Sequence, residues 1–354
     1  MLSRSEFDVM LALKKTPTAS QRAIASECGM SLGTVNAVVK SLGDRGLVEG
    51  GALTAEGEDE LSPYKVRNAV IMAAGLSSRM APLSYECPKG VLKVRGEVLI
   101  ERQIRQLKEA GIDDITVVVG FKKEEFFYLE VLFGVKIVVN TDYATRNNHA
   151  TLFQVRDIIG NTYICSSDNY FSRNPFESCV DDAYYAALYA DGPTPEWCVY
   201  EGDDGYIDRV SVGGENAWYM MGHVFWSEPF SRKFVEILER EYDTPEIRDK
   251  LWEAVYAAHL DELKLRIRRY DQSDIFEFDS LDELRGFDAS YIDDTRSQII
   301  RQLAARLGCG EAALTDFHAR KACGSTQAVG FTFRYQNETY QYDYKNKEME
   351  KING

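Results

Sequence analysis

The spacing of hydrophobic positions changes along the chain and predicts a small helical unit over residues 1–62. Apolar side chains recur there at helical spacing, and Ser20 and Ser31 are placed to cap the second and third of three helices. Residues 46–54 have the length of a short hairpin. Three helices followed by a hairpin predict a winged helix-turn-helix domain.

Residues 66–288 show a different pattern, in which unbroken apolar runs alternate with amphipathic stretches. The runs predict strands, and one stretch predicts a helix over 99–110; the strands are 68–74, 115–120, 135–139 and 162–166. Alternating strands and helices indicate an α/β fold with a doubly wound, mostly parallel sheet. Ligands of such sheets bind outside the carboxyl ends of the strands, so the loops after Ala74 and Ser166 are expected to share one crevice.

Residues 289–354 are expected to form a small α+β extension. A helix is predicted over 295–307, and a Gly/Ser/Thr turn follows within 321–326. Two alternating runs, 330–335 and 338–342, then predict a β-hairpin around Gln336-Asn337.

Composition and charge narrow the function classes. The chain has 354 residues with 41 basic and 56 acidic side chains, a formal net charge of -15, which repels polyanions and suits a cationic ligand. No apolar run approaches the roughly 18 residues of a membrane helix, so no membrane span is expected. The charged N-terminus is no secretory signal, and the seven scattered cysteines lack a CxxC pair, which favours a cytoplasmic location.

The first segment resembles the winged-helix regulators of bacteria. That resemblance implies DNA as a possible partner, but residues 1–62 hold only six Lys/Arg against nine Asp/Glu, and the expected recognition helix carries only Lys40. Nucleic-acid binding needs cations against the phosphates. A docking or dimerisation module is therefore favoured over DNA binding.

The strongest chemical signal follows the first strand of the second segment. The run 72–83, followed by Pro88-Lys89, is similar to the signature of the nucleotidyltransferases that build nucleotide-sugars and CDP-alcohols. Small residues there let backbone N–H groups approach a triphosphate. The resemblance implies a Rossmann-like fold in which Ala73, Ala74 and Gly75 contact the nucleotide, with Arg79 and Lys89 as catalytic cations beside its phosphates. Ser77 stands where a glycine is common.

Two aspartates are the candidate metal ligands. Asp168 ends a buried strand, where a carboxylate is expensive to bury unless it holds a cation or accepts hydrogen bonds. The resemblance implies that Asp168 and Asp279 coordinate Mg²⁺, and Asp168 is also counted as catalytic. Helix capping is the alternative for both, and Ser280 begins a good helix start next to Asp279.

The acceptor is expected to be a cationic phospho-alcohol. The Glu-Lys-Pro stretch of sugar-directed members is absent, and the chain instead resembles the phosphocholine cytidylyltransferases of bacterial cell-surface decoration. That resemblance implies a choline cage of aromatic and acidic side chains, which attract a quaternary ammonium: Trp197, Trp252, Glu253 and Glu277. Leu251 replaces a tyrosine of that subfamily.

Further residues are assigned to the nucleotide pocket. The resemblance implies that Tyr143, Asn147 and Asn148 bind the nucleotide or organise its pocket, with capping of the helix near Ala150 as the alternative. His149 receives no catalytic role, because a phosphomonoester dianion needs no general base.

The predicted function is Mg²⁺-dependent transfer of a cytidylyl group from CTP to phosphocholine, giving CDP-choline and pyrophosphate. Two alternatives remain: phosphoethanolamine or a sugar-1-phosphate as acceptor, and a ligand-responsive DNA-binding regulator that uses the same fold as a sensor. Residues 321–326, the hairpin and Tyr340 also resemble the opening of choline kinases. The chain ends before any His-x-Asp catalytic loop, so no kinase activity is expected of it.

Overall fold

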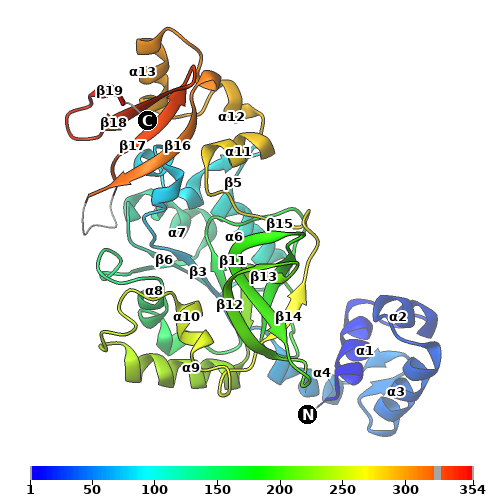
Figure 1. The fold of residues 1–354 in the computed structure, drawn as a ribbon. Coiled ribbons are helices and arrows are strands. Elements are labelled where there is room, and N and C mark those ends of the chain that lie inside the picture. Colours follow the sequence, from blue (N-terminus) through cyan, green and yellow to red (C-terminus); the bar gives the residue numbers. More distant parts are fainter. Residues whose placement is uncertain (1, 323–327, 353–354) are drawn as a thin grey trace.

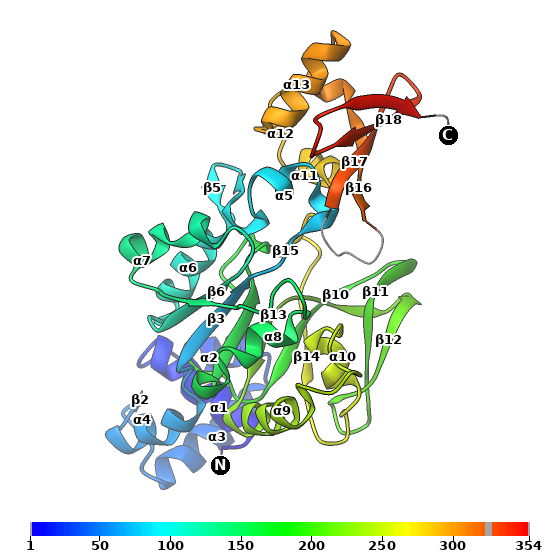
Figure 2. The same ribbon diagram turned by 90° about the vertical axis from the view of Figure 1, so that its left-hand side faces the viewer.

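The computed structural model describes residues 2–322 and 328–352. The N-terminal unit and the C-terminal sheet lie at opposite ends of a central α/β domain in both views (Figure 1, Figure 2). In the described ranges, none of the helices has the length and apolar character needed to cross a bilayer.

The N-terminal unit has the predicted order of elements. It comprises α1 (Arg4–Lys15), α2 (Gln21–Glu27), α3 (Leu32–Asp44), the hairpin β1 (Val48–Glu49) and β2 (Ala52–Leu53), and α4 (Ala55–Leu61). Ser20 and Ser31 cap α2 and α3, each accepting a hydrogen bond from the backbone N–H three residues on. Helix α4, capped by Thr54, was not predicted.

The four predicted strands of the second segment are neighbours in one sheet. They are β3 (Asn68–Ala73), β6 (Ile115–Val119), β7 (Lys136–Val139) and β8 (Thr162–Ser166), in the order β8-β3-β6-β7, and all pair in parallel. The expected parallel half of the fold is therefore confirmed.

A second half of the sheet was not predicted, and most of it is antiparallel. It adds β10 (Tyr184–Tyr189), β11 (Pro193–Glu201), β12 (Ile207–Glu215), β13 (Trp218–Trp226) and β14 (Arg266–Arg269). Strand β13 joins the halves by pairing antiparallel with β8, while β14 lies parallel to β10. The result is a mixed nine-stranded sheet.

Helices cover both faces of this sheet. Neighbouring residues of each strand point to opposite faces, so they pack against different helices. Val70 packs with α8 (His149–Phe153), α9 (Glu228–Glu241) and α10 (Trp252–Ala257), whereas Ile71 packs with α6 (Leu99–Glu109) and α7 (Tyr128–Phe133). Short elements at the rim are α5 (Leu83–Glu86) and the pairs β4 (Lys93–Val94) with β5 (Glu97–Val98) and β9 (Tyr170–Phe171) with β15 (Ile275–Phe276).

The C-terminal segment forms a small α+β unit. It contains α11 (Leu281–Phe287), α12 (Ser290–Asp293), α13 (Gln298–Leu307) and a four-stranded antiparallel sheet of β16 (Thr315–Lys321), β17 (Ala328–Tyr335), β18 (Glu338–Asp343) and β19 (Met349–Ile352). The predicted hairpin is confirmed, with Gln336 and Asn337 both at positive φ between β17 and β18. The predicted Gly/Ser/Thr turn falls largely on 323–326, outside the described residues.

This unit packs directly onto the end of the 72–83 run and the residues that follow it. Met80 and Leu83 belong to the same hydrophobic core as Leu303 and Phe331. The Glu86 carboxylate accepts hydrogen bonds from the first backbone N–H groups of α13, at 2.9 and 3.3 Å. Tyr85 stacks on Tyr344 with ring centroids 3.7 Å apart. The predicted boundary at 289 thus lies within a shared core.

Candidate active site

A cleft of about 710 Å³ opens at the carboxyl ends of β3, β7 and β8, where the sequence predicted a ligand. Its lining includes Asp168 and all of the predicted nucleotide-binding residues except Arg79, namely Ala73, Ala74, Gly75, Lys89, Tyr143, Asn147 and Asn148. The structure therefore brings together side chains from three separate loops at the predicted edge of the sheet.

The signature loop presents its backbone to this cleft. A Cβ on Gly75 would meet no atom within 4 Å, so the loop faces open space there. Ser77 has φ 47°, the left-handed region that glycine enters at least cost, which explains why related sequences place glycine here. Gly120 was missed by the sequence analysis: a Cβ there would lie 2.8 Å from both the Ala74 carbonyl oxygen and Tyr143. Its lack of a side chain lets the Tyr143 loop close against the signature loop.

Three carboxylates surround one buried ammonium at the rim of the cleft. Lys89, only 6% exposed, has its Nζ 3.0 Å from Asp168 Oδ2, 3.3 Å from Asp279 Oδ1 and 3.9 Å from Glu277 Oε1. Burial lowers the pKa of Lys89, but the charges of the three carboxylates outweigh it and leave the pKa raised. Lys89 is therefore a firmly charged cation in the middle of the cluster.

Arg79 reaches the same cluster from outside the cleft. Its guanidinium pairs with Asp279 while its side chain is mostly exposed. Asp279 thus contacts both predicted catalytic cations, Arg79 and Lys89.

Glu277, assigned by resemblance to the acceptor cage, lies beside Asp168 in this cluster. The charge of Asp168, followed by burial, raises the pKa of Glu277 to about 7. The amide of Asn169 holds the carboxylate by donating from Nδ2 to Oε2 at 3.2 Å. Two neighbouring carboxylates resist joint ionisation, so Glu277 takes up a proton more readily than an isolated carboxylate.

A magnesium ion at this site would depend on the nucleotide for part of its ligand shell. Within residues 2–322 and 328–352, no group of three or more His, Cys, Asp or Glu side chains is arranged to hold a metal. Asp168 and Asp279 both contact Lys89 Nζ, which itself lies between the two carboxylates. Mg²⁺ commonly takes one or two carboxylates and completes its shell with waters and substrate phosphates. Asp168 and Asp279 are the residues that would hold it.

The two predicted asparagines join the wall of the cleft to the segment before α10. Asn147 Nδ2 donates to the Asp249 carbonyl at 3.1 Å. Asn148 accepts from the Trp252 N–H at 2.7 Å through Oδ1 and donates to Glu253 at 3.2 Å through Nδ2. Helix α8 begins at His149 without a side-chain cap, so the capping alternative is wrong, and the pocket-organising role stays a prediction.

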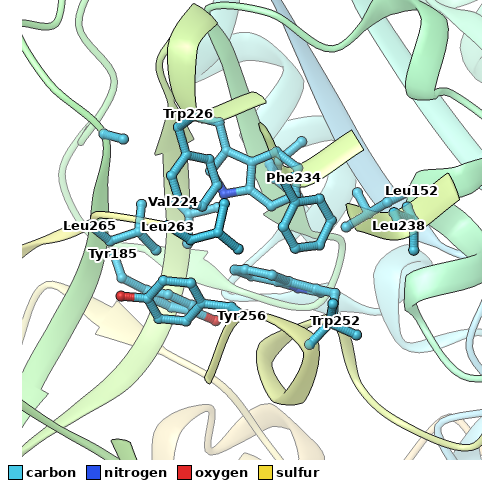
Figure 3. Packing of buried hydrophobic residues seen from close by; sticks show 14 of the residues in the cluster. Leu152, Tyr185, Val224, Trp226, Phe234, Leu238, Trp252, Tyr256, Leu263 and Leu265 are labelled. Carbon is cyan, nitrogen blue, oxygen red and sulfur yellow. The ribbon is translucent and has the colours of Figure 1, made fainter. Parts of the chain in front are cut away.

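Trp252 is a core residue in this structure. Figure 3 draws its ring among Phe234, Trp226 and Tyr185, and its exposed fraction is 1%. It stacks on Tyr185 with ring centroids 5.6 Å apart and meets Trp226 edge-on. Its face is closed to a ligand here, and none of the four predicted cage residues lines the described cleft.

Tyr185 is a buried partner of Glu253 that sequence reasoning missed. Its hydroxyl donates to Glu253 at 3.2 Å, and after burial the charges of Glu253 and then Glu277 are what raise its pKa. Tyr185 thus contacts Glu253, one of the two acidic residues that the sequence assigned to the cage. Trp197, half-buried on β11, packs at the margin of the same core. No sequence signal marks Tyr185, because it sits in one of the unpredicted strands.

The fold and the site define a nucleotidyltransferase. Residues 69–155 match the MobA-like NTP transferase domain, and residues 2–49 match the winged helix-turn-helix DNA-binding family. The chain belongs to the cytidylyltransferase family that includes the choline-phosphate and 2-aminoethylphosphonate enzymes of bacteria.

The chain has nearly the same sequence identity to a choline-phosphate enzyme as to a 2-aminoethylphosphonate enzyme. It is 34% identical over 217 residues to the choline-phosphate cytidylyltransferase of Streptococcus pneumoniae, covering 61% of this chain and 95% of that one. It is 35% identical over 234 residues to the 2-aminoethylphosphonate cytidylyltransferase of Lancefieldella rimae, covering 64% and 93%. The solved CTP:phosphocholine cytidylyltransferase of Streptococcus pneumoniae aligns with TM-score 0.60 at 34% identity over 62% of this chain and 96% of that one.

Proposed function

We propose that this enzyme transfers a cytidylyl group from CTP to phosphocholine, releasing pyrophosphate and CDP-choline, with Mg²⁺ as its metal. The observation that carries the proposal is the cleft lined by the predicted nucleotide-binding residues, with Asp168 in its lining and Glu277 beside it around Lys89. Carboxylates attract an organic cation such as choline. Because Glu277 and Asp168 share one cluster, a cation held by Glu277 would have its phosphate next to the nucleotide cleft.

The residues of the cluster act by position and charge. A phosphate oxygen of the acceptor forms a bond to the α-phosphorus of CTP, and the bond from that phosphorus to the bridging oxygen of pyrophosphate breaks in line. Bound Mg²⁺ would neutralise charge that develops on the phosphates. Lys89 contributes a positive charge that is buried away from water. Arg79 contributes a second positive charge on the side of the leaving pyrophosphate.

A second acceptor class is favoured by one specific position. Leu251 removes an aromatic wall that a quaternary ammonium uses, while Glu253 and Glu277 remain as hydrogen-bond acceptors for a primary ammonium. The similarity to a 2-aminoethylphosphonate cytidylyltransferase supports an acceptor with a primary amine. Phosphoethanolamine also carries a primary amine and belongs to the same class of acceptor.

The deciding experiment measures pyrophosphate release from CTP and Mg²⁺ with four acceptors in parallel: phosphocholine, phosphoethanolamine, 2-aminoethylphosphonate and glucose-1-phosphate. We expect the highest kcat/KM with phosphocholine. Preference for a primary amine would move the assignment to the second class, and turnover with glucose-1-phosphate alone would reject the cationic acceptor. No turnover with any acceptor would favour the sensor alternative.

Two substitutions sharpen that experiment. Trp197→Ala should raise the KM for phosphocholine and leave the KM for CTP unchanged, because Trp197 is proposed to face only the amine. Leu251→Tyr should raise the ratio of kcat/KM for phosphocholine to that for 2-aminoethylphosphonate by restoring an aromatic wall. An unchanged acceptor KM in Trp197→Ala would remove that residue from the cage.

The charges of the N-terminal unit support docking rather than DNA binding. Arg4 pairs with Asp181 at 2.5 Å, Lys14 with Glu58 at 2.5 Å and Arg45 with Glu6 at 2.9 Å. The positive charges of Arg4, Lys14 and Arg45 are thus paired with carboxylates of the same chain. The DNA-binding alternative predicts salt-dependent binding to duplex DNA that changes when CTP is added, and its absence at low salt would reject it.

A cytoplasmic location is part of the same proposal. The six cysteines within the described ranges are all free thiols, and three of them, Cys165, Cys179 and Cys198, are buried. Unpaired buried thiols suit a reducing compartment.

A further inference from the structure

The turn that carries Asp168 is held from behind by one buried amide. Gln103 of α6 has no exposed surface, and its Nε2 donates to the Ser166 carbonyl at 2.7 Å and to the Asn169 carbonyl at 2.9 Å. These two carbonyls flank the residues of the turn between β8 and β9. Both N–H bonds of a single side chain therefore span the segment that presents Asp168 to the cleft.

The orientation of this amide is determined by its surroundings. Gln103 Oε1 is buried without a hydrogen-bond partner among the described residues. Rotating the amide would place that oxygen against two carbonyl oxygens, which cannot donate to it. An unpaired buried acceptor lowers the stability of the fold. The two hydrogen bonds to the turn are therefore kept although Oε1 remains without a partner.

The opposite side of the turn is packed equally closely. A Cβ on Gly90 would lie 2.7 Å from Ser167 Oγ, and the neighbouring Lys89 reaches Asp168 at 3.0 Å. The turn is thus enclosed between the Lys89–Gly90 segment and Gln103. If Asn169 lost its hydrogen bond to Gln103, its own side-chain amide, which donates to Glu277, would also move.

Other side chains of α6 hold the strand that follows but not the turn. Gln106 Nε2 donates to the Phe171 carbonyl at 3.2 Å, and Arg102 donates to the Phe171 and Ser172 carbonyls at 2.9 and 3.1 Å. Gln106 is also buried with an unpaired Oε1. It is a matched control, with the same side chain on the same helix.

We propose that Gln103 is a positioning residue for Asp168: its amide fixes the 167–169 turn so that Asp168 meets Lys89 and the metal-bound nucleotide in register. This inference rests on the proposed use of Mg²⁺ and CTP. Displacing a reacting group by about 1 Å can cost about a hundredfold in rate. Loss of the Gln103 amide is therefore expected to weaken metal–nucleotide binding and catalysis together.

The test compares Gln103→Met with Gln106→Met in the full chain. Gln103→Met should speed amide hydrogen exchange of residues 167–169, lower the affinity for Mn²⁺ in the presence of CTP measured by electron paramagnetic resonance, and lower kcat by about tenfold or more. Gln106→Met should lower the melting temperature to a similar degree without these effects. Equal changes in the two variants would mean a general packing role and would overturn the proposal.

A second variant and a function-free readout keep the outcomes distinct. If Gln103→Met does not fold, Gln103→Glu keeps the shape of the side chain and should show the same changes. If neither variant folds, the amide serves the fold and the positioning proposal is rejected. Should the wild type not turn over CTP, the proposed function fails, and hydrogen exchange at 167–169 still decides the role of Gln103.

Discussion

At the scale of single residues, the site depends on the balance between Lys89 and the carboxylates around it. Because Lys89 is buried, removing one carboxylate does more than delete a ligand: it leaves the ammonium less compensated. Charge and geometry therefore cannot be altered separately at this point, and the substitutions must be chosen to keep shape.

Asp168→Asn preserves shape and removes the charge. We expect kcat to fall by about a thousandfold, the size of effect seen when one electrostatic group is removed from an active site. The fold should persist because the turn remains held by Gln103. Steady-state pyrophosphate release and circular dichroism measure the two quantities. Near-normal turnover at saturating Mg²⁺ would contradict the metal assignment.

His223 provides a pH test far from the cleft. Burial among aromatic rings lowers its pKa to about 3, and its Nε2 lies 3.0 Å from the Tyr184 hydroxyl. Since the unfolded state binds the proton more readily, the contribution of His223 to stability is complete above pH 6.5 and is lost as pH falls towards 3.

His223→Gln should remove this dependence. Between pH 6.5 and pH 5 the wild type is expected to lose about 1.7 kcal/mol of unfolding free energy through this residue, and the variant is not. Urea unfolding at the two pH values checks the prediction. Parallel losses in both proteins would show that other groups account for the pH dependence.

Residues were predictable where a motif or a strand end marked them. Asp168 follows a buried apolar strand, and Lys89 follows a small-residue loop, so both could be identified before the fold was known. Tyr185 and Gln103 could not, because their roles come from contacts with segments distant in sequence, Glu253 for one and the Asp168 turn for the other.

At the scale of elements, the wall of the cleft depends on one junction. The turn before α8 is joined to the start of α10 by Asn148, which contacts both Trp252 and Glu253. Trp252 in turn anchors α10 in the core drawn in Figure 3. The loop before α8 and the start of α10 are therefore held together through Asn148.

Asn148→Ala tests this junction. It should lower the unfolding free energy by about 1–3 kcal/mol, because it leaves a buried N–H and part of a carboxylate without partners. It should also raise the KM for the acceptor. Asn346→Ala, in an exposed turn where the side chain also donates to a glutamate, is the matched control and should change neither. Unfolding and steady-state kinetics of both variants give the answer.

The parallel strands were predictable as elements, and the antiparallel ones were not. A strand covered by helices on both faces reads as an unbroken apolar run, as in 115–119. Strand β11 alternates exposed and half-buried positions and contains two prolines, Pro193 and Pro195, so it lacks that signal. Trp197, which the sequence assigned to the cage, lies on this strand, and its surroundings could therefore not be predicted.

At the scale of the whole molecule, the C-terminal unit and the nucleotide segment are one packing unit. Phe331 is fully buried in the core that also contains Met80 and Leu83. The N-terminal unit has its own core around Met10 and Val35. Damage to either end should therefore have different consequences for the site.

Phe331→Ala and Met10→Ala compare those consequences. Each opens a cavity and should cost about 2–5 kcal/mol locally. Phe331→Ala is expected to raise the KM for CTP several-fold because the core under the signature loop is loosened, whereas Met10→Ala should leave it unchanged. Equal KM values in the two variants, with both shown destabilised by thermal unfolding, would separate the C-terminal unit from the site.

The stacking of Tyr85 on Tyr344 and the capping of α13 by Glu86 also bear on how the enzyme is made. Domains fold as units while the chain leaves the ribosome from its N-terminus. The parallel sheet and Asp168 emerge early, but the cover of the signature loop includes a residue synthesised more than two hundred positions later. In a nascent chain the parallel strands would therefore be complete before Tyr344 is available, and its stacking on Tyr85 would be among the last contacts to form.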